Sequence, residues 1–139
     1  MKKLFFFVFI LYSFWSCSLG DDTDSFNYEF VPIENVTIAD TLVLDAVHTV
    51  VYSYYRPTSC HGFHDLYYSA EDNERTVAVI NAVYDNSDCE PLEENSDNLI
   101  ERTFNFKPLN TGTYVFKFWQ GLDENDEDQY LVFEIPVED

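Results

Sequence analysis

Basic residues are scarce in this chain. It has 7 Lys and Arg against 26 Asp and Glu, which gives a formal net charge of −19 at pH 7. A surface with this excess of negative charge repels phosphate backbones and anionic lipid head groups. Nucleic acid is therefore not expected as a partner, and the acidic composition is typical of a protein that stays soluble in a crowded compartment.

Glycine is also rare, and the motifs of common enzyme classes are missing. Only 4 Gly occur in 139 residues. The chain has no Gly-x-Ser-x-Gly, no His-Glu-x-x-His and no Gly-rich loop that would cradle a phosphate. We therefore predict a non-enzymatic domain that uses no cofactor.

The chain lacks a second long apolar run, so only its N-terminal segment points to a membrane. Two lysines, Lys2 and Lys3, precede an apolar run over residues 4–14, and Cys17 follows shortly after. The run is shorter than the ~20 residues of a spanning helix, and this order of parts is that of a secretory signal. Cleavage without lipidation and a retained anchor are the alternatives to lipidation at Cys17. We expect three segments: a signal peptide (1–16), the lipidated Cys with an acidic tether (17–26) and one folded domain (27–139).

The junction at Cys17 resembles the lipobox of bacterial lipoproteins, in which the Cys is diacylated and becomes the new N-terminus. Phe14 and Trp15 stand where the usual box has an aliphatic and a small residue. This looser box, followed by Asp21 and Asp22, is similar to lipoproteins of the Bacteroidota. The resemblance implies a chain that is lipid-anchored in the outer membrane and faces the periplasm or the cell surface.

Alternation of apolar and polar residues continues through the rest of the chain, and no segment has the period of a helix. Pro32 interrupts the first apolar run, 27–38, which favours an edge strand or a switch between two sheets. Residues 75–84 are apolar on both faces, as expected of a central strand, whereas the acidic residues 85–98 indicate a long connection. About seven or eight such strands predict an all-β domain, an antiparallel β-sandwich.

A turn signature precedes the penultimate predicted strand. The residues Asn110-Thr111-Gly112-Thr113-Tyr114-Val115-Phe116 resemble the Asp-x-Gly-x-Tyr-x-Cys signature of the immunoglobulin-like fold. The resemblance implies an immunoglobulin-like sandwich in which the Tyr114 hydroxyl bonds to the upstream backbone. Phe116 replaces the Cys, so the inter-sheet disulfide of antibody domains is excluded. A similar Gly-x-Tyr-x-Phe-x-Phe-Trp hairpin ends many uncharacterised Bacteroidota lipoproteins, and implies fold and location but no activity.

Three cysteines occur, and two remain once Cys17 is lipidated. In an oxidising compartment we expect Cys60 and Cys89 to form a disulfide that flanks the central strand. The alternative is a zinc or copper site in which His61 and His64 join the two thiolates. Free thiols would favour the metal, and a closed bridge would favour the structural role.

An acidic loop, residues 121–128, joins the last two predicted strands. Its oxygen atoms could hold calcium, because some of its residues and Glu134 have EF-hand spacing. Asp128 stands where that loop needs Gly, and strands rather than helices flank it. We interpret the loop as a solvated hairpin tip, with calcium as the alternative. The candidate ligands are Asp123, Asn125, Asp126, Glu127 and Asp128.

Trp119 and Tyr130 bracket the acidic loop on neighbouring predicted strands. Such an aromatic pair can stack on a sugar or fix a protein partner, although a Trp at this place can also pack on its own loop. We therefore predict an envelope module that binds a protein or a glycan through its loops. The alternative is a metal-handling envelope protein that uses the Cys/His or the acidic loop residues.

Overall fold

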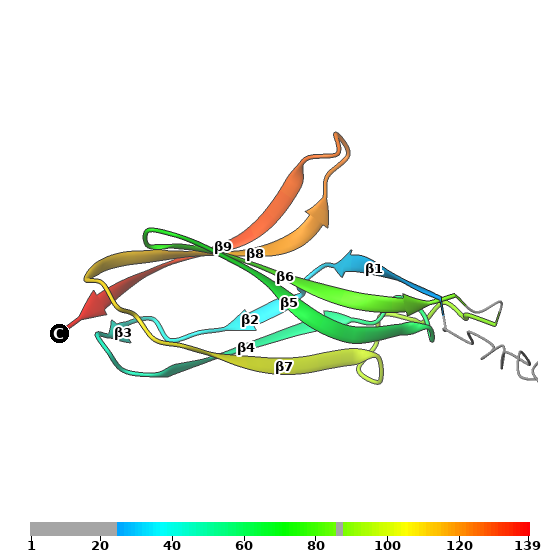
Figure 1. Ribbon diagram of the computed structural model, residues 1–139, viewed down its shortest axis with the longest axis horizontal. Helices are drawn as coiled ribbons and strands as arrows, with labels where there is room; N and C mark the ends of the chain where they lie inside the picture. Colours follow the sequence, from blue (N-terminus) through cyan, green and yellow to red (C-terminus); the bar gives the residue numbers. More distant parts are fainter. Residues whose placement is uncertain (1–24, 86–87) are drawn as a thin grey trace, which may run out of the picture.

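The computed structural model describes residues 25–85 and 88–139, which form only strands and turns, so the predicted all-β class is confirmed (Figure 1). The leader, Cys17 and nearly all of the predicted tether lie outside these residues. Within the two described ranges no helix is long and apolar enough to cross a membrane. The strands of these ranges are β1 (Phe26–Val31), β2 (Asn35–Thr37), β3 (Leu42–Val43), β4 (His48–Tyr55), β5 (His61–Glu71), β6 (Glu74–Tyr84), β7 (Leu99–Phe106), β8 (Gly112–Leu122) and β9 (Asp128–Glu138).

The strands form two sheets that lie one above the other (Figure 1). The larger sheet has 6 strands in the order β1-β6-β8-β9-β3, with β5 paired to β6 as well. The smaller sheet has 3 strands in the order β2-β4-β7. Buried side chains from both sheets belong to one hydrophobic cluster, so the arrangement fits a β-sandwich. The prediction that its strands are antiparallel is wrong at two pairs, because β3 pairs parallel with β9 and β6 pairs parallel with β8.

β6 is the central strand of the larger sheet, as its two apolar faces predict. β5 pairs with it antiparallel along one edge. The other edge is shared, because β1 pairs antiparallel with Val79–Tyr84 and β8 pairs parallel with Glu74–Val77. β1 and β8 therefore follow one another along the same edge, and their outward side chains share one surface.

The chain changes sheet at Pro32, which is one of the two alternatives that the sequence analysis gives for this residue. β1 belongs to the larger sheet and β2 to the smaller one. Pro32 has no N–H to donate, whereas Ile33 N–H donates to Trp119 O (2.9 Å) and Glu34 N–H donates to Ser53 O (2.8 Å). The connection is therefore bonded to β8 on one side and to β4 on the other. The split of this first run accounts for a ninth strand in the described residues, where the sequence predicts about seven or eight.

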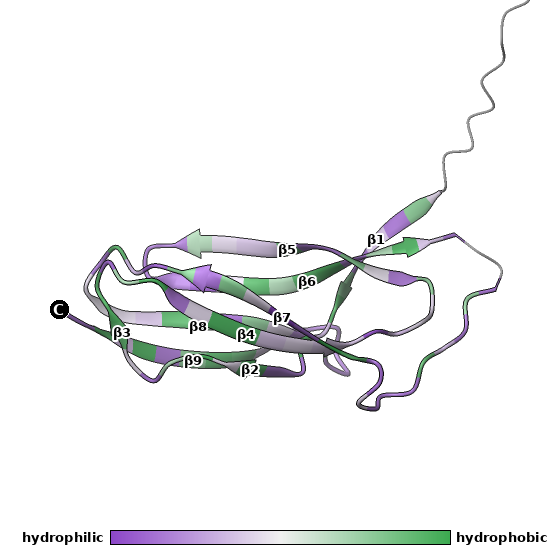
Figure 2. Cartoon of the chain, turned by 90° about the horizontal axis from the view of Figure 1, so that it is seen from below, coloured by the Kyte–Doolittle hydropathy of each residue, from purple (hydrophilic) through white to green (hydrophobic). Residues whose placement is uncertain are grey.

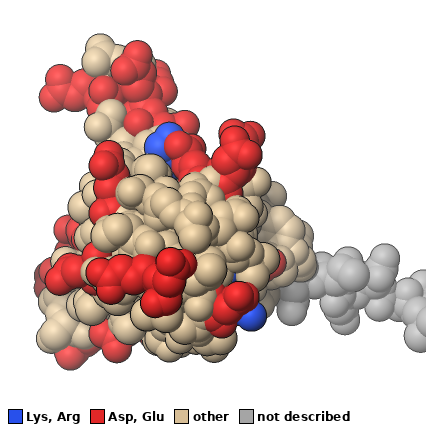
Figure 3. Space-filling view, turned by 90° about the vertical axis from the view of Figure 1, so that its left-hand side faces the viewer, with Lys and Arg blue, Asp and Glu red and all other residues tan. Residues whose placement is uncertain are grey.

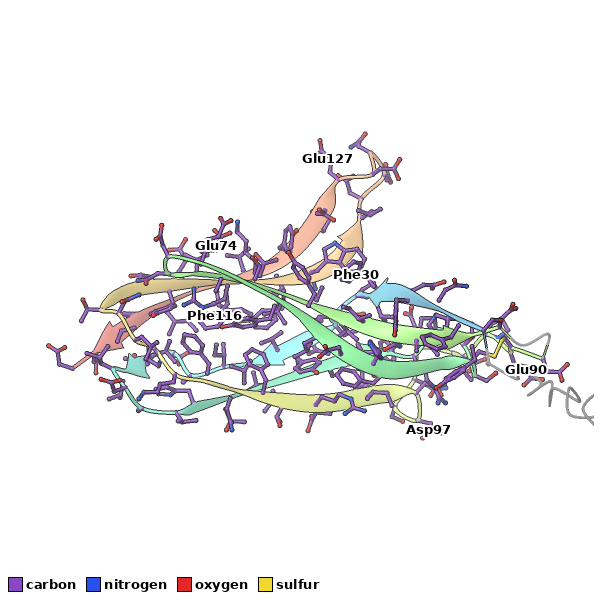
Figure 4. The ribbon with its side chains drawn as sticks, in the orientation of Figure 1. Phe30, Glu74, Glu90, Asp97, Phe116 and Glu127 are labelled. Carbon is purple, nitrogen blue, oxygen red and sulfur yellow. A yellow bond between two sulfur atoms is a disulfide. The ribbon has the colours of Figure 1, made fainter. Side chains whose placement is uncertain are left out.

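The core lies between the two sheets. β8 places Tyr114, Phe116 and Phe118 there at alternate positions, and Figure 4 shows Phe116 pointing toward the smaller sheet. Phe106 of β7 meets Tyr114 and Phe116 edge-to-face, with ring centroids 5.1 and 5.0 Å apart. Burial of each such ring stabilises the fold by roughly 1.5–3 kcal/mol. The apolar and polar residues that alternate along β9 are green and purple in Figure 2.

The turn before β8 has the hydrogen bonds that the tyrosine signature predicts. Tyr114 is fully buried, and its Oη accepts the backbone N–H of Leu109 and of Asn110, each at 3.2 Å. Gly112 has a φ of +98°, which a side chain would disfavour. The phenol therefore ties the chain that enters β8 to the segment that leaves β7.

Cys60 and Cys89 form a disulfide with a Cα–Cα distance of 5.4 Å, which confirms the predicted bridge. It joins the turn before β5 to the connection after β6, and it lies near Glu90 in Figure 4. Backbone bonds support the same junction, since Ser59 N–H donates to Glu90 O (2.9 Å) and Tyr84 N–H donates to Cys60 O (3.2 Å). The bridge therefore fastens the long acidic connection to the larger sheet.

Candidate functional site

The disulfide changes the chemistry of the predicted Cys/His metal site, because it leaves no thiolate at Cys60 or Cys89. His61 is buried, with its Nδ1 2.8 Å from Thr58 Oγ1 and its Nε2 3.3 Å from Glu29 Oε2. His64 instead packs against Tyr28 in a tilted arrangement, with ring centroids 4.3 Å apart. Glu29 and Tyr28 are successive residues of β1 and point to opposite faces. The two imidazoles therefore lie on opposite faces of the larger sheet and do not converge on one ion.

In the acidic loop, the candidate calcium ligand Asp123 is hydrogen-bonded to the backbone of the loop itself. Asp123 Oδ1 accepts the N–H of Glu127 (3.0 Å) and of Asn125 (2.7 Å), and these bonds lower the pKa of the Asp123 carboxyl. Asp126 completes the turn with a φ of +62°. In residues 25–85 and 88–139 no group of three or more His, Cys, Asp or Glu side chains is placed to hold a metal ion. The loop has the geometry of a self-bonded hairpin tip.

The β8–β9 hairpin bends sharply below this tip. The register of the two strands shifts between Trp119 and Gly121, and Gly121 has a φ of +103°. A Cβ on Gly121 would lie 3.4 Å from Pro32 Cγ, so the bend packs tightly on the connection where the chain changes sheet. Figure 1 shows the end of the hairpin rising away from the sheet. The bend therefore creates an angle between the hairpin and the outer face of the larger sheet.

A pocket of about 360 Å³, which we call the aromatic cleft, lies in this angle. Phe30 faces the hairpin from β1, as Figure 4 shows, and the rings of Tyr67 and Trp119 lie 5.9 and 5.8 Å from its ring centroid. The small side chains of Thr76 and Ala78 on β6 leave the space between these rings open. The cleft is lined by Phe30, Tyr67, Thr76, Ala78, Trp119, Asp128 and Tyr130.

Asp128 lies beside the two hairpin aromatics of the cleft and holds one of them in place. Trp119 Nε1–H donates to Asp128 Oδ1 at 2.7 Å, and Trp119 is the cross-strand partner of Tyr130. Burial raises the pKa of Tyr130, and the negative charge of Asp128 and a hydrogen bond to it raise it further. The phenol therefore stays protonated beside Asp128. The carboxylate thus fixes the Trp119 indole, and the cross-strand pairing shows that Trp119 and Tyr130 lie side by side.

The aromatic cleft continues into a row of exposed aromatic side chains on the same face. We call this row the aromatic face: Phe26, Tyr28, Phe30, Tyr67 and Tyr84, each between 45% and 54% exposed. Phe26 contacts both Tyr28 and Tyr84, with ring centroids 5.3 and 6.2 Å apart. Neighbouring rings cover these side chains only in part, since the His64 ring lies against Tyr28 and the Trp119 ring lies near Phe30.

The sequence analysis identifies Trp119 and Tyr130 but misses their partners Phe30 and Tyr67. The signal for Phe30 is the alternation Phe26-x-Tyr28-x-Phe30, which places three aromatic rings on one face of a strand. Alternation alone does not say whether that face is buried. For Tyr67 no signal in the sequence relates it to Trp119, because the strands β5 and β8 meet only through β6.

The surroundings of the cleft are strongly acidic. The hairpin tip carries Asp123, Glu124, Asp126, Glu127 and Asp128, and Figure 3 shows acidic side chains over this projection. The basic side chain closest along the hairpin, Lys117, is paired with Glu74, with Nζ 2.9 Å from Oε1. The positive charge of Lys117 is therefore largely neutralised, and the field at the cleft is negative.

Comparison with family models, with curated proteins and with solved structures found no match to this chain.

Proposed function

We propose that the chain is a non-enzymatic, lipid-anchored envelope protein that binds a protein or glycan partner. The observation that carries the proposal is the aromatic face together with the aromatic cleft. Aromatic rings are costly to leave in water, and contiguous exposed apolar patches mark interaction surfaces. The proposal puts the binding residues on strands of the larger sheet and on the bent hairpin, whereas the sequence analysis expects them in the loops.

The surface suits binding because its side chains are fixed before a partner arrives. The Phe30 ring lies between the rings of Tyr67 and Trp119, and Asp128 restrains Trp119 by a hydrogen bond. A partner that covers such rings loses little side-chain entropy from this surface. The proposal therefore places the energetic centre of the interface at Phe30, Tyr67 and Trp119.

We also propose that the two sheets are a variant of the immunoglobulin-like sandwich. The support is the Tyr114 phenol, which bonds to the backbone of Leu109 and Asn110 as the tyrosine corner of that fold does. The parallel pairing of β6 with β8 is a departure from the antiparallel sheets of that fold. The variant would supply a scaffold and no activity of its own.

The membrane location in this proposal comes from the leader and Cys17. A Cys17→Ser variant is expected to lose incorporated fatty acid and to leave the outer-membrane fraction, while the unchanged protein retains both. Equal fatty-acid labelling of the two proteins would contradict lipidation at Cys17.

Binding is tested by probing a glycan array and a peptide array with the fluorescently labelled protein. Phe30→Ser and Tyr67→Ser are expected to lose the ligands that the unchanged protein binds. Leu109→Ser is the matched control, because Leu109 is 69% exposed but lies in the turn before β8, outside the aromatic face. Binding that all three variants retain, or no binding on either array, would contradict the proposed function.

A further inference from the structure

We propose that the aromatic cleft binds the side chain of a Lys or Arg from a basic segment of a protein partner. This inference deepens the proposed function and rests on it, because it names the class of partner that the same surface takes. It is carried by the combination of four aromatic rings, a fixed carboxylate and an acidic rim in one place.

The rings of the cleft favour a cation over a neutral group. The face of an aromatic ring carries negative electrostatic potential, and a guanidinium or ammonium within about 6 Å of its centroid is attracted to it. Phe30, Tyr67, Trp119 and Tyr130 all line the pocket. This chain already uses the interaction at its surface, where the exposed Arg102 guanidinium lies 3.8 Å from the Phe63 ring centroid.

Asp128 adds a full negative charge to the wall of the cleft. Its donor within the protein, the Trp119 indole, and the neighbouring Tyr130 hydroxyl are both neutral, so the carboxylate is oriented without losing its charge. A basic side chain in the cleft would pair with this carboxylate, which is exposed in the free protein, and the attraction strengthens as the partner covers the pair.

The shape of the cleft fits a long basic side chain. The apolar floor at Ala78 and the methyl of Thr76 can pack against the methylene stem, while the charged head reaches Asp128. The hairpin tip above the cleft carries four more carboxylates, Asp123, Glu124, Asp126 and Glu127. Further basic residues of an extended partner would face these carboxylates, so the rim and the cleft select the same chemistry.

The test measures binding of two matched peptides to the full-length purified protein by isothermal titration calorimetry. One peptide alternates Arg with Gly over nine residues, and the other replaces each Arg by citrulline, which has the same shape and no charge. We expect the Arg peptide to bind at least about tenfold more tightly, and its advantage to shrink at high salt. Equal binding of both peptides would overturn the inference.

Asp128→Asn isolates the charge, because the amide oxygen can still accept the Trp119 indole N–H. We expect it to weaken binding of the Arg peptide by about tenfold or more while binding of the citrulline peptide is unchanged. Asp97→Asn, in the connection before β7, is the matched control for the loss of one surface charge. If Asp128→Asn does not fold, Tyr67→Leu is the second variant, because it removes a ring but keeps an apolar wall. It should weaken binding of the Arg peptide more than binding of the citrulline peptide.

Failure of this inference differs from failure of the proposed function. Suppose that a neutral oligosaccharide such as cellohexaose binds through Phe30 and Tyr67 and that the Arg peptide binds no better than the citrulline peptide. This result would contradict a basic partner but would agree with the proposed binding function. Absence of any ligand for the aromatic face on the arrays would overturn both.

Discussion

Tyr52 is a buried phenol on β4, and its replacement by Phe is expected to make the fold less sensitive to alkali. Only 2% of its side chain is exposed, and it packs beside Phe104 in the core. Burial raises the pKa of Tyr52 from 10.0 to about 12, against the opposing effect of the Arg102 charge. The folded protein therefore keeps a proton that the unfolded chain loses between pH 10 and pH 12.

The loss of stability at high pH follows from the difference between the pKa of Tyr52 in the folded protein and its pKa in the unfolded chain. A group with a raised folded-state pKa contributes its full stability below the unfolded pKa, and this contribution is lost as the pH rises through the folded pKa. For Tyr52 the loss is about 1.4 kcal/mol at pH 11 and approaches about 2.7 kcal/mol above pH 12. Burial also raises the pKa of Tyr54 and of Tyr68. The Tyr52→Phe variant is therefore still expected to lose some stability at high pH.

The assay is urea unfolding at pH 8 and at pH 11, followed by far-ultraviolet circular dichroism. Tyr52→Phe is expected to lose about 1.4 kcal/mol less than the unchanged protein between the two pH values. Tyr84→Phe removes a phenol that is 50% exposed and serves as the control. If Tyr52→Phe and the unchanged protein lose the same stability, the argument from burial of this phenol is wrong.

Three further changes test the fold. Replacing both Cys60 and Cys89 by Ala opens a loop with a sequence separation of 29, and is expected to lower the free energy of unfolding by about 3–4 kcal/mol in urea. Tyr114→Phe removes the acceptor of two backbone N–H groups, and should cost about 1–2 kcal/mol in the same assay. Gly121→Ala forces a side chain onto a residue with a φ of +103° beside Pro32, and should cost about 1–2 kcal/mol and weaken binding in the aromatic cleft.

Each of these three predictions has an outcome that would contradict it. A Cys60/Cys89 variant within about 1 kcal/mol of the unchanged protein would show that the bridge does not restrain the unfolded chain. Tyr114→Phe with an unchanged urea midpoint would show that water replaces the phenol. Gly62→Ala is the control for Gly121→Ala, because its Cβ would lie 3.8 Å from the Tyr84 ring, an ordinary contact. Equal stability of these two Ala variants would remove the case for a strained bend.

Local pattern was sufficient to predict much of this fold. Alternation predicts the strands, Pro32 indicates an edge strand or a change of sheet, and the apolar faces of 75–84 predict the central strand. Each of these features depends on residues close together in the chain. The disulfide follows from the count of cysteines and the expected compartment rather than from geometry.

Pairing between distant strands could not be predicted in the same way. Nothing in the sequence around Glu74 indicates that β6 pairs parallel with β8, since parallel partners share no turn. The bend at Gly121 depends on its contact with Pro32, far away in sequence. The aromatic cleft needs both of these features. From the sequence alone it was therefore possible to predict only Trp119 and Tyr130, which face one another across a hairpin.

The position of β1 has a consequence for synthesis. β1 is made first, but its partner residues Val79–Tyr84 are made only after β2 to β5. Until then a strand with three aromatic side chains has no partner and is open to pairing with another chain. The acidic residues Asp21, Asp22 and Asp24 immediately precede it and can act as gatekeepers against aggregation. Replacing these three by Ser is expected to lower the soluble yield without changing the melting temperature of the protein that folds, and an unchanged yield would refute this role.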